Sequence, residues 1–120
     1  MKRLSEYITL HESEVGNLKP ANKEELIDII NQRIAEYGPK CDLNDIDVSR
    51  VKDMSNLFES SEFDGDISKW DVSRVVDMRY MFWNSKFNGD ISKWNVSSVR
   101  GMNGMFNDSK FNGDLSKWDT

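Results

Sequence analysis

Pairs of Asp and Asn side chains flank a glycine at three places in the sequence: Asp64-Gly65-Asp66, Asn88-Gly89-Asp90 and Asn112-Gly113-Asp114. If these segments stack, their oxygen atoms could approach a Ca²⁺ ion, which takes about six to eight oxygen ligands. The spacing differs from that of an EF-hand loop or of the nonapeptide calcium repeat. Turn formation explains the same residues, because Asx-Gly pairs tolerate positive φ and the Asx side chain can bond to its own backbone. We therefore expect turns and no metal, with calcium binding as the alternative.

Residues that carry nucleophilic or acid–base catalysis are scarce. His11 is the only histidine and Cys41 the only cysteine, so a Ser-His-Asp, Cys-His or multi-cysteine metal arrangement has no support. Cys41 is expected to act as a small buried hydrophobic residue, since no basic or helix-terminal setting for a reactive thiol is visible. We predict that the protein is not an enzyme and takes no cofactor.

The totals describe an acidic, well-solvated chain. Its 120 residues suit one domain, with 38% hydrophobic and 31% charged residues. The net charge of −5 and the pI near 4.9 argue against nucleic acid, whose phosphates need clustered Lys and Arg. No apolar run of about 18 residues is present, so we expect no membrane insertion. No secretion signal or lipid-anchor cysteine is visible, which favours a cytoplasmic or virion location for the chain as given.

One motif recurs along the last two thirds of the chain with a period of 24 residues. FDGDISKWDVSRV at 63–75 returns as FNGDISKWNVSSV at 87–99 and as FNGDLSKWDT at 111–120. A fixed period in this range indicates a solenoid, in which each unit buries its apolar face only against its neighbours. The residues expected to form the shared core recur at the same period: Trp70, Trp94, Trp118, Phe58, Phe82, Phe106, Met78 and Met102.

Each repeat contains one segment with a strand pattern and one with a helix pattern. Residues 67–72 partly match the L-x-x-L-x-L strand of leucine-rich repeats. Residues 54–58 have apolar side chains at i, i+3 and i+4, which predicts a helix of about two turns or fewer. The predicted fold class is α/β: a short right-handed solenoid like that of leucine-rich repeats, with about three strand-turn-helix coils of 24 residues. The coils would span 41–64, 65–88 and 89–112, with a partial coil at 113–120.

A capping helix is expected within residues 20–40. It follows a polar leader at 1–19, for which the spacing of apolar residues suits a short helix and a frayed terminus is the alternative. Asn22 is a suitable N-cap with Glu25 in the capping-box position, and Gly38 with Pro39 provides the stop. An apolar face suits a lid over the open end of the first coil. That face would consist of Leu26, Ile27, Ile30, Ile34 and Tyr37.

The unit from Trp70 to Trp94 reads WDVSRVVDMRYMFWNSKFNGDISKW. It resembles the BspA-like leucine-rich repeat family, in the form found in mycoplasma-type surface lipoproteins and in surface proteins of other bacteria. The resemblance covers residues 42–119 and implies a non-enzymatic, protein-binding or adhesive surface. The residues that match the family's unit are Trp70, Asp71, Val72, Ser73, Val75, Met78, Met81, Phe82, Phe87, Asn88, Asp90, Ile91, Ser92 and Trp94.

A second resemblance involves only the first eight residues, MKRLSEYI. They are similar to the short leaders of structural and capsid-packaged proteins in some large tailed phages. This similarity implies an alternative function, a structural or packaged component of a tailed-phage virion with an N-terminal targeting leader.

The exposed face of the predicted strands is the candidate binding surface, because stacked repeats create extended faces for protein partners. A merely solvated face is the alternative. The chain stops just after Trp118, and exposed aromatic residues at an open end favour association. We therefore also expect end-to-end self-association through residues 116–120. The candidate face consists of Lys69, Asp71, Ser73, Lys93, Asn95, Ser97, Lys117 and Asp119.

Overall fold

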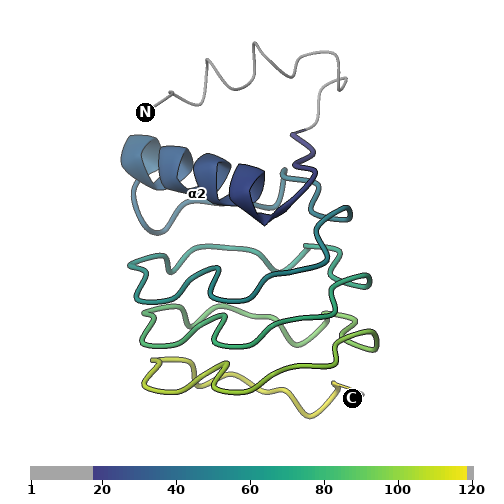
Figure 1. The fold of residues 1–120 in the computed structure, drawn as a ribbon. Helices are drawn as coiled ribbons and strands as arrows, with labels where there is room; N and C mark the ends of the chain where they lie inside the picture. The colour runs from purple at the N-terminus through teal and green to yellow at the C-terminus, as the bar shows by residue number, and fades with distance from the viewer. Residues whose placement is uncertain (1–17, 119–120) are drawn as a thin grey trace.

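The computed structural model describes residues 18–118, and Figure 1 shows one helix lying across the end of a stack of chain layers. Helix α2 spans Lys23–Tyr37. The Asn22 side chain accepts a hydrogen bond from the Glu25 amide at 3.0 Å, and the Glu25 carboxylate accepts one from the Ala21 amide at 3.0 Å. Side-chain oxygens thus accept hydrogen bonds from backbone amides at the start of the helix, which have no partner within the helix. Gly38 ends the helix at a φ of 90°.

One face of α2 packs on the first layer. Leu26, Ile29 and Ile30 are buried, and they belong to one apolar cluster with the side chains of the layers. The buried stripe is rotated from the predicted one, since Ile29 is fully buried whereas Tyr37 is 67% exposed. The helix thus covers one end of the stack.

Beyond α2 the chain forms layers that stack in parallel, one for each repeat (Figure 1). Layer 1 comprises residues 41–64, layer 2 residues 65–88 and layer 3 residues 89–112, followed by 113–118. Four alternate amides of layer 1 donate to carbonyls of layer 2 at 2.8–3.0 Å. The same four bonds recur from layer 2 to layer 3 at 2.9 Å, and we call this set the inter-layer ladder. Its donors are Met54, Asn56, Phe58 and Ser60 in layer 1, and Met78, Tyr80, Phe82 and Asn84 in layer 2.

The predicted strands are not formed. Within residues 18–118 the β-type pairings are four isolated parallel bridges, and no sheet is built from them. The backbone around Trp70 folds as consecutive turns, in which the Trp70 amide donates to the Ile67 carbonyl. Asp66 and Asp71 stabilise these turns by accepting from the amides two residues further on. Such local bonds from Asp side chains compete with strand formation.

The predicted short helices are also wrong, since α2 is the only helix in the described part of the chain. Residues 54–60 make successive turns, with Asn56 at a φ of 61° and Ser60 at 55°. This left-handed conformation interrupts a helix. The i, i+3, i+4 spacing instead reflects turns whose inner corners are apolar. The predicted α/β solenoid of strand-turn-helix coils is therefore not the fold, and turns build the layers. The same left-handed positions in layers 2 and 3 are Tyr80, Asn84, Gly104 and Asp108.

Columns of phenylalanine rings run through the core. Phe82 lies nearly parallel to Phe58 and to Phe106, with ring centroids 5.5 Å apart in both pairs. Offset-parallel rings at such separations are a favourable aromatic geometry. Each layer thus contributes one ring to a continuous apolar column. A second column of the same kind consists of Phe63, Phe87 and Phe111.

The tryptophans form a further column and also bond to the backbone. Trp94 stacks on Trp70 and on Trp118 at 6.4 Å. Its indole N–H donates to the Ile67 carbonyl of the preceding layer at 3.0 Å. Trp70 and Trp94 are 4% exposed, whereas Trp118 in the last described segment is partly exposed. The column therefore joins the layers by packing and by hydrogen bonds.

The glycine between two Asx residues is needed for space. Positive φ occurs only at Gly38 and Gly104 among the described glycines, so the predicted positive-φ turn at Gly65 is wrong. A Cβ on Gly65 would lie 1.8 Å from the Cys41 carbonyl oxygen and 2.7 Å from the Phe63 ring. Glycine at this position allows the backbones of two layers to come close.

Candidate functional site

The lysines of the candidate face form a row along the stack. Lys69, Lys93 and Lys117, which we call the lysine column, are exposed, whereas the tryptophan that follows each of them belongs to the core. The Lys69 amide is fixed by the side chain of Asn44 at 2.8 Å. Within residues 18–118, no ion pair or hydrogen bond engages the three ammonium groups. The column presents three positive charges on a backbone held by hydrogen bonds.

Carboxylates border the lysine column. Asp66, Asp90 and Asp114 each lie three residues before a lysine. The pKa of each is below its ordinary value, chiefly because of hydrogen bonds: the Asn44 side chain acts most strongly on Asp66, and the following serine on the other two. The nearby lysine lowers each pKa further by a smaller amount. At neutral pH, a row of negative charges thus runs beside the row of positive ones.

Four other residues of the candidate face are used to shape the backbone. Asp71 accepts from the Ser73 amide at 3.1 Å and from its hydroxyl at 2.6 Å. Asn95 accepts in the same way from Ser97, at 3.1 and 2.7 Å. The Ser73 hydroxyl is the main reason that the pKa of Asp71 is lowered. The lysine column is therefore the part of this face that remains available for a partner.

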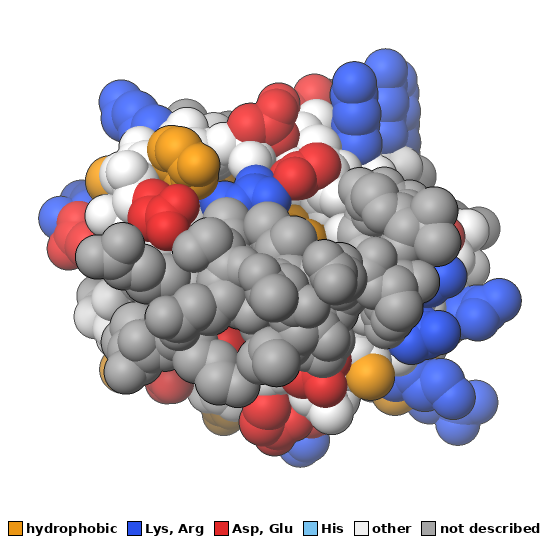
Figure 2. Space-filling view, turned by 90° about the horizontal axis from the view of Figure 1, so that it is seen from above, with side chains coloured by type: hydrophobic (Ala, Val, Ile, Leu, Met, Phe, Trp, Pro, Cys, Tyr) orange, Lys and Arg blue, Asp and Glu red, His pale blue; other side chains and the backbone are white. Residues whose placement is uncertain are grey.

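Basic side chains project from the rim of the molecule. Figure 2, seen from the α2 end, shows Lys and Arg gathered mainly along the right-hand edge, while Asp and Glu are spread over the rest. Long cationic side chains at a rim reach well beyond the backbone turns that carry them. A partner approaching this edge would first meet positive charge.

The Asx-Gly-Asp segments use their oxygens between layers. Asp64 Oδ1 accepts from the Asn88 amide at 2.8 Å, and Asn88 Oδ1 accepts from the Asn112 amide at 2.7 Å. Asp64 and Asn88 thus bind the next layer and not their own backbone as expected, whereas Asp66, Asp90 and Asp114 accept from the local amide two residues further on. Within residues 18–118, no three His, Cys, Asp or Glu side chains converge as metal ligands.

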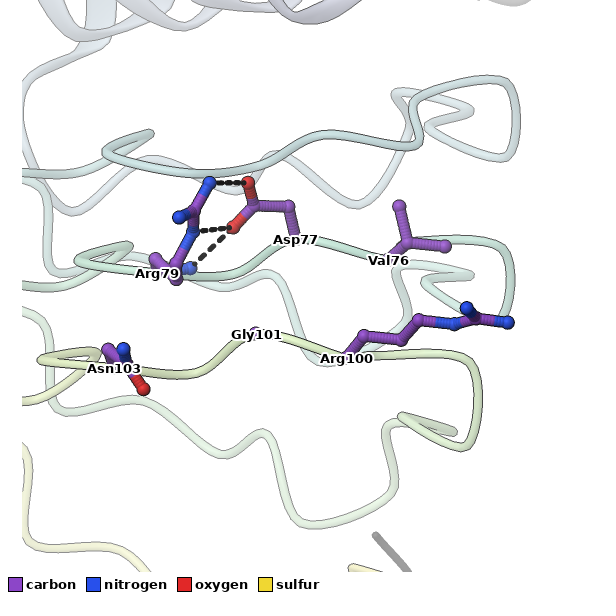
Figure 3. A pocket seen from close by; sticks show the side chains of 6 residues that line it. All are labelled: Val76, Asp77, Arg79, Arg100, Gly101 and Asn103. Carbon is purple, nitrogen blue, oxygen red and sulfur yellow. Dashed lines mark hydrogen bonds and ion pairs between the residues drawn. The ribbon is translucent and has the colours of Figure 1, made fainter.

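A hollow of about 420 Å³ lies across the edges of layers 2 and 3 (Figure 3). The Arg79 guanidinium donates to both Asp77 oxygens at 3.0 and 2.8 Å, and this bonding lowers the Asp77 pKa. The Asp77 carboxylate, which could otherwise serve as a general acid or base in this hollow, is therefore held in an ion pair with Arg79. Figure 3 shows Arg100 directed away from that pair. The hollow is lined by Val76, Asp77, Arg79, Arg100, Gly101 and Asn103.

A second hollow, of about 430 Å³, lies where the start of α2 meets layer 1. Lys23 spans this junction: its ammonium donates to the Ser55 carbonyl and hydroxyl at 3.1 Å and lies 3.5 Å from the Asp53 carboxylate. Further along α2, Arg33 binds both oxygens of Asp45 at 2.8 and 2.6 Å. Charged contacts thus fasten the helix to layer 1 at two points.

Cys41 stands at the repeat position of Gly65. Its side chain is partly buried, and this burial raises the pKa of the thiol. A raised thiol pKa lowers the fraction of reactive thiolate at neutral pH. The setting is consistent with a packing role for Cys41.

A comparison with protein families matches the part of the chain that forms the layers. The family model described as "Mycoplasma protein of unknown function, DUF285" matches residues 30–120. This chain belongs to the DUF285 family. The match begins within α2 and includes all the layers of this DUF285 protein. Searches of curated proteins and of solved structures found no match. No described helix of the DUF285 chain is long and apolar enough to span a membrane.

Two structurally important features were missed in the sequence. The left-handed positions had a usable signal, since Asn56 and Gly104 share one repeat position and both tolerate positive φ. The bond between Arg33 and Asp45 had none, because the two residues belong to different elements and follow no common period. Residues 1–17 of the predicted leader, which include the phage-like segment and His11, lie outside the described residues, as do Asp119 and Thr120.

Proposed function

We propose that this DUF285 protein is a non-enzymatic protein–protein interaction module of a bacterial surface-type repeat protein. The closer relationship to BspA-like leucine-rich repeats is part of this proposal and is supported by the shared residues of the Trp70 to Trp94 unit. The single observation that carries the proposal is the lysine column. Its three ammonium groups are exposed and, within the described residues, unpaired.

The partner would present carboxylates to the lysine column. Charged groups at the rim of an interface steer the encounter and select partners of opposite charge. The bordering Asp66 and Asp90 carboxylates oppose a uniformly anionic ligand, which favours a protein segment with spaced acidic side chains. The acidic total of the chain, with a net charge of −5, likewise disfavours nucleic acid.

A binding measurement with a defined acidic peptide tests this proposal. The probe is a fluorescein-labelled peptide of about ten residues with alternating Glu and Ser, and fluorescence anisotropy reports its binding to the full chain. We expect salt-sensitive binding that weakens at least about fivefold in the double variant Lys69→Gln/Lys93→Gln, since each exposed charge pair contributes up to about 1 kcal/mol.

The chain offers a matched control for these substitutions. Lys86→Gln/Lys110→Gln removes two lysines from the same two layers and changes the net charge equally. Lys86 pairs with Glu62 at 3.5 Å, and neither Lys86 nor Lys110 belongs to the lysine column. Equal weakening in the two double variants would show that only net charge matters, and the proposed face would be wrong.

A further inference from the structure

Layer 2 differs from the other layers at three positions that solvent reaches, where it carries large apolar side chains. Val76 is 41% exposed and Tyr80 43% exposed, and Trp83 is partly exposed. We call these three residues the layer-2 edge. The period of the repeat does not account for them, because the same positions in layers 1 and 3 hold polar residues or glycine: Lys52 and Arg100, Asn56 and Gly104, Glu59 and Asn107.

The core does not use the two aromatic rings of the layer-2 edge. Neither Tyr80 nor Trp83 belongs to the apolar core, and neither ring contacts another aromatic ring within residues 18–118. The indole groups of the three other tryptophans each donate to a backbone carbonyl at 2.9–3.0 Å. The Trp83 indole has no such partner in the same part of the chain. Such rings with a polar group are enriched at protein interfaces.

The backbone of Tyr80 also points to a role beyond the fold. Its φ of 58° is a left-handed conformation that bulky residues rarely adopt. Asn56 and Gly104 stand at the same repeat position with φ values of 61° and 64°, and Asn and Gly tolerate this conformation best. Tyrosine is therefore less stable here than asparagine would be. Strained residues of this kind concentrate at functional sites.

Layer 3 leaves room for the large side chains of layer 2. A Cβ on Gly104 would lie 2.5 Å from two carbons of the Tyr80 ring. A Cβ on Gly101 would lie 3.1 Å from Arg79 Cγ, and the guanidinium of Arg79 is fixed by both oxygens of Asp77. The side chains beside the hollow are thus held in place, and groups ordered before binding lose less entropy on association.

Two cations flank Val76 along the stack. The Val76 amide donates to the Lys52 carbonyl at 2.8 Å, and the Arg100 amide donates to the Val76 carbonyl at 2.9 Å. Within residues 18–118, the charged groups of Lys52 and Arg100 make no ion pair or hydrogen bond. Figure 3 shows Val76 and Arg100 at the same end of the hollow of about 420 Å³. A complementary partner would place carboxylates on both sides of an apolar contact.

We propose that the layer-2 edge binds an extended segment of a partner protein in which aromatic side chains lie between two acidic ones. Hydrogen-bonded neighbouring backbones lie about 4.8 Å apart, so Lys52 and Arg100 are separated by about 10 Å. Three residues of an extended chain span a similar distance at about 3.3 Å each, which predicts acidic side chains at i and i+3. The rings between them contact Val76 and Tyr80. This surface shares no residue with the lysine column, and the proposal does not depend on that column.

An NMR titration with a defined peptide tests the proposal. The probe is acetyl-Ser-Glu-Phe-Phe-Glu-Ser-amide, added to the full ¹⁵N-labelled chain. We expect shifts of the Val76, Tyr80 and Arg100 amide signals and of the Trp83 indole signal, with half saturation below about 1 mM. One control peptide has Gln in place of both Glu residues, and another has Ser in place of both Phe residues. Each should bind at least about fivefold more weakly.

The chain offers a matched variant, Tyr80→Asn/Trp83→Asn. Asparagine already stands at these repeat positions in layers 1 and 3, and the net charge is unchanged. This variant should bind the probe at least about fivefold more weakly and melt within about 5 °C of the wild type. Lys69→Gln/Lys93→Gln should bind the probe as the wild type does.

Three results would overturn the proposal. The first is the absence of saturable shifts with up to about 1 mM probe. The second is a melting temperature of Tyr80→Asn/Trp83→Asn that falls by more than about 5 °C, because the two rings would then stabilise the layers. The third is binding that weakens in Lys69→Gln/Lys93→Gln and is unchanged in the asparagine variant. That result would locate the peptide at the lysine column and so support the function proposed above.

Discussion

Single residues fix this fold mainly through turn chemistry. Asp or Asn two positions before a serine recurs in every layer, and its side chain accepts from the backbone amide of that serine. These local bonds hold the corners of each layer, while larger side chains fill the interior. Glycine is needed for two different reasons in this chain: Gly65 leaves space for a neighbouring backbone, and Gly38 adopts a positive φ.

Gly65→Ala should lower the free energy of unfolding by about 3 kcal/mol or more, because the new Cβ would lie 1.8 Å from the Cys41 carbonyl oxygen. Gly38→Ala meets no atom within 4 Å but has a φ of 90°, so it should cost only about 1–2 kcal/mol. Chemical denaturation of both variants measures the difference. Similar losses for the two alanines would contradict the close approach of layers 1 and 2.

Trp94→Phe tests the indole bond between layers. The substitution keeps an aromatic ring in the column but leaves the Ile67 carbonyl without its donor at 3.0 Å, which should cost about 1–3 kcal/mol. Trp118→Phe removes the equivalent bond to Ile91 at a partly exposed site, where water can replace the donor. We expect the Trp118 variant to lose less than about 1 kcal/mol in a urea melt. A larger loss for Trp118→Phe than for Trp94→Phe would speak against the bond's role.

Among the elements, α2 could be predicted closely from its caps and the layers could not. Asn22, Glu25 and Gly38 act locally, so their signal lies within a few residues of the helix ends. Residues 54–58 have a helical pattern of apolar side chains, but their amides bond to a segment 24 residues away. The spacing of apolar side chains cannot distinguish a helix from turns that a neighbouring repeat stabilises. Residues that adopt a left-handed conformation, such as Asn56, distinguish these turns from a helix.

The contact between α2 and layer 1 predicts a sensitivity to acid. The hydrogen bonds from Arg33 are the main reason that the pKa of Asp45 lies below its ordinary value of 3.8. A depressed native pKa means that the unfolded chain takes up the proton first as pH falls. Asp45 therefore contributes stability above about pH 4, and this contribution is lost as pH falls through the native pKa.

Asp45→Asn should remove that contribution. We expect lower stability than the wild type at pH 6 and a shallower decline between about pH 4.5 and 2.5, measured by urea denaturation at each pH. Glu36→Gln provides the control, since Glu36 is an exposed residue of α2 that makes no ion pair within the described residues. Parallel pH profiles for Asp45→Asn and the wild type would show that the Arg33 contact does not stabilise the fold.

The molecule as a whole is a stack whose period was readable in the sequence. Repeat spacing predicted that equivalent side chains lie side by side, as the rings of Phe58, Phe82 and Phe106 do. It also placed the lysine column on one face, because each lysine precedes a core tryptophan. The period does not specify how the backbone runs between these points. For that reason strands and helices were expected where turns are found.

The stacked fold depends on amides that bond from one layer to the next along the inter-layer ladder. Hydrogen exchange followed by NMR tests it residue by residue. The ladder amides of Met78, Tyr80, Phe82 and Asn84 should exchange at least about a hundredfold more slowly than their counterparts in layer 3. Those counterparts are Met102, Gly104, Phe106 and Asp108, for which no next layer lies within residues 18–118. Equal protection in the two sets, or none in either, would contradict the stacked layers described here.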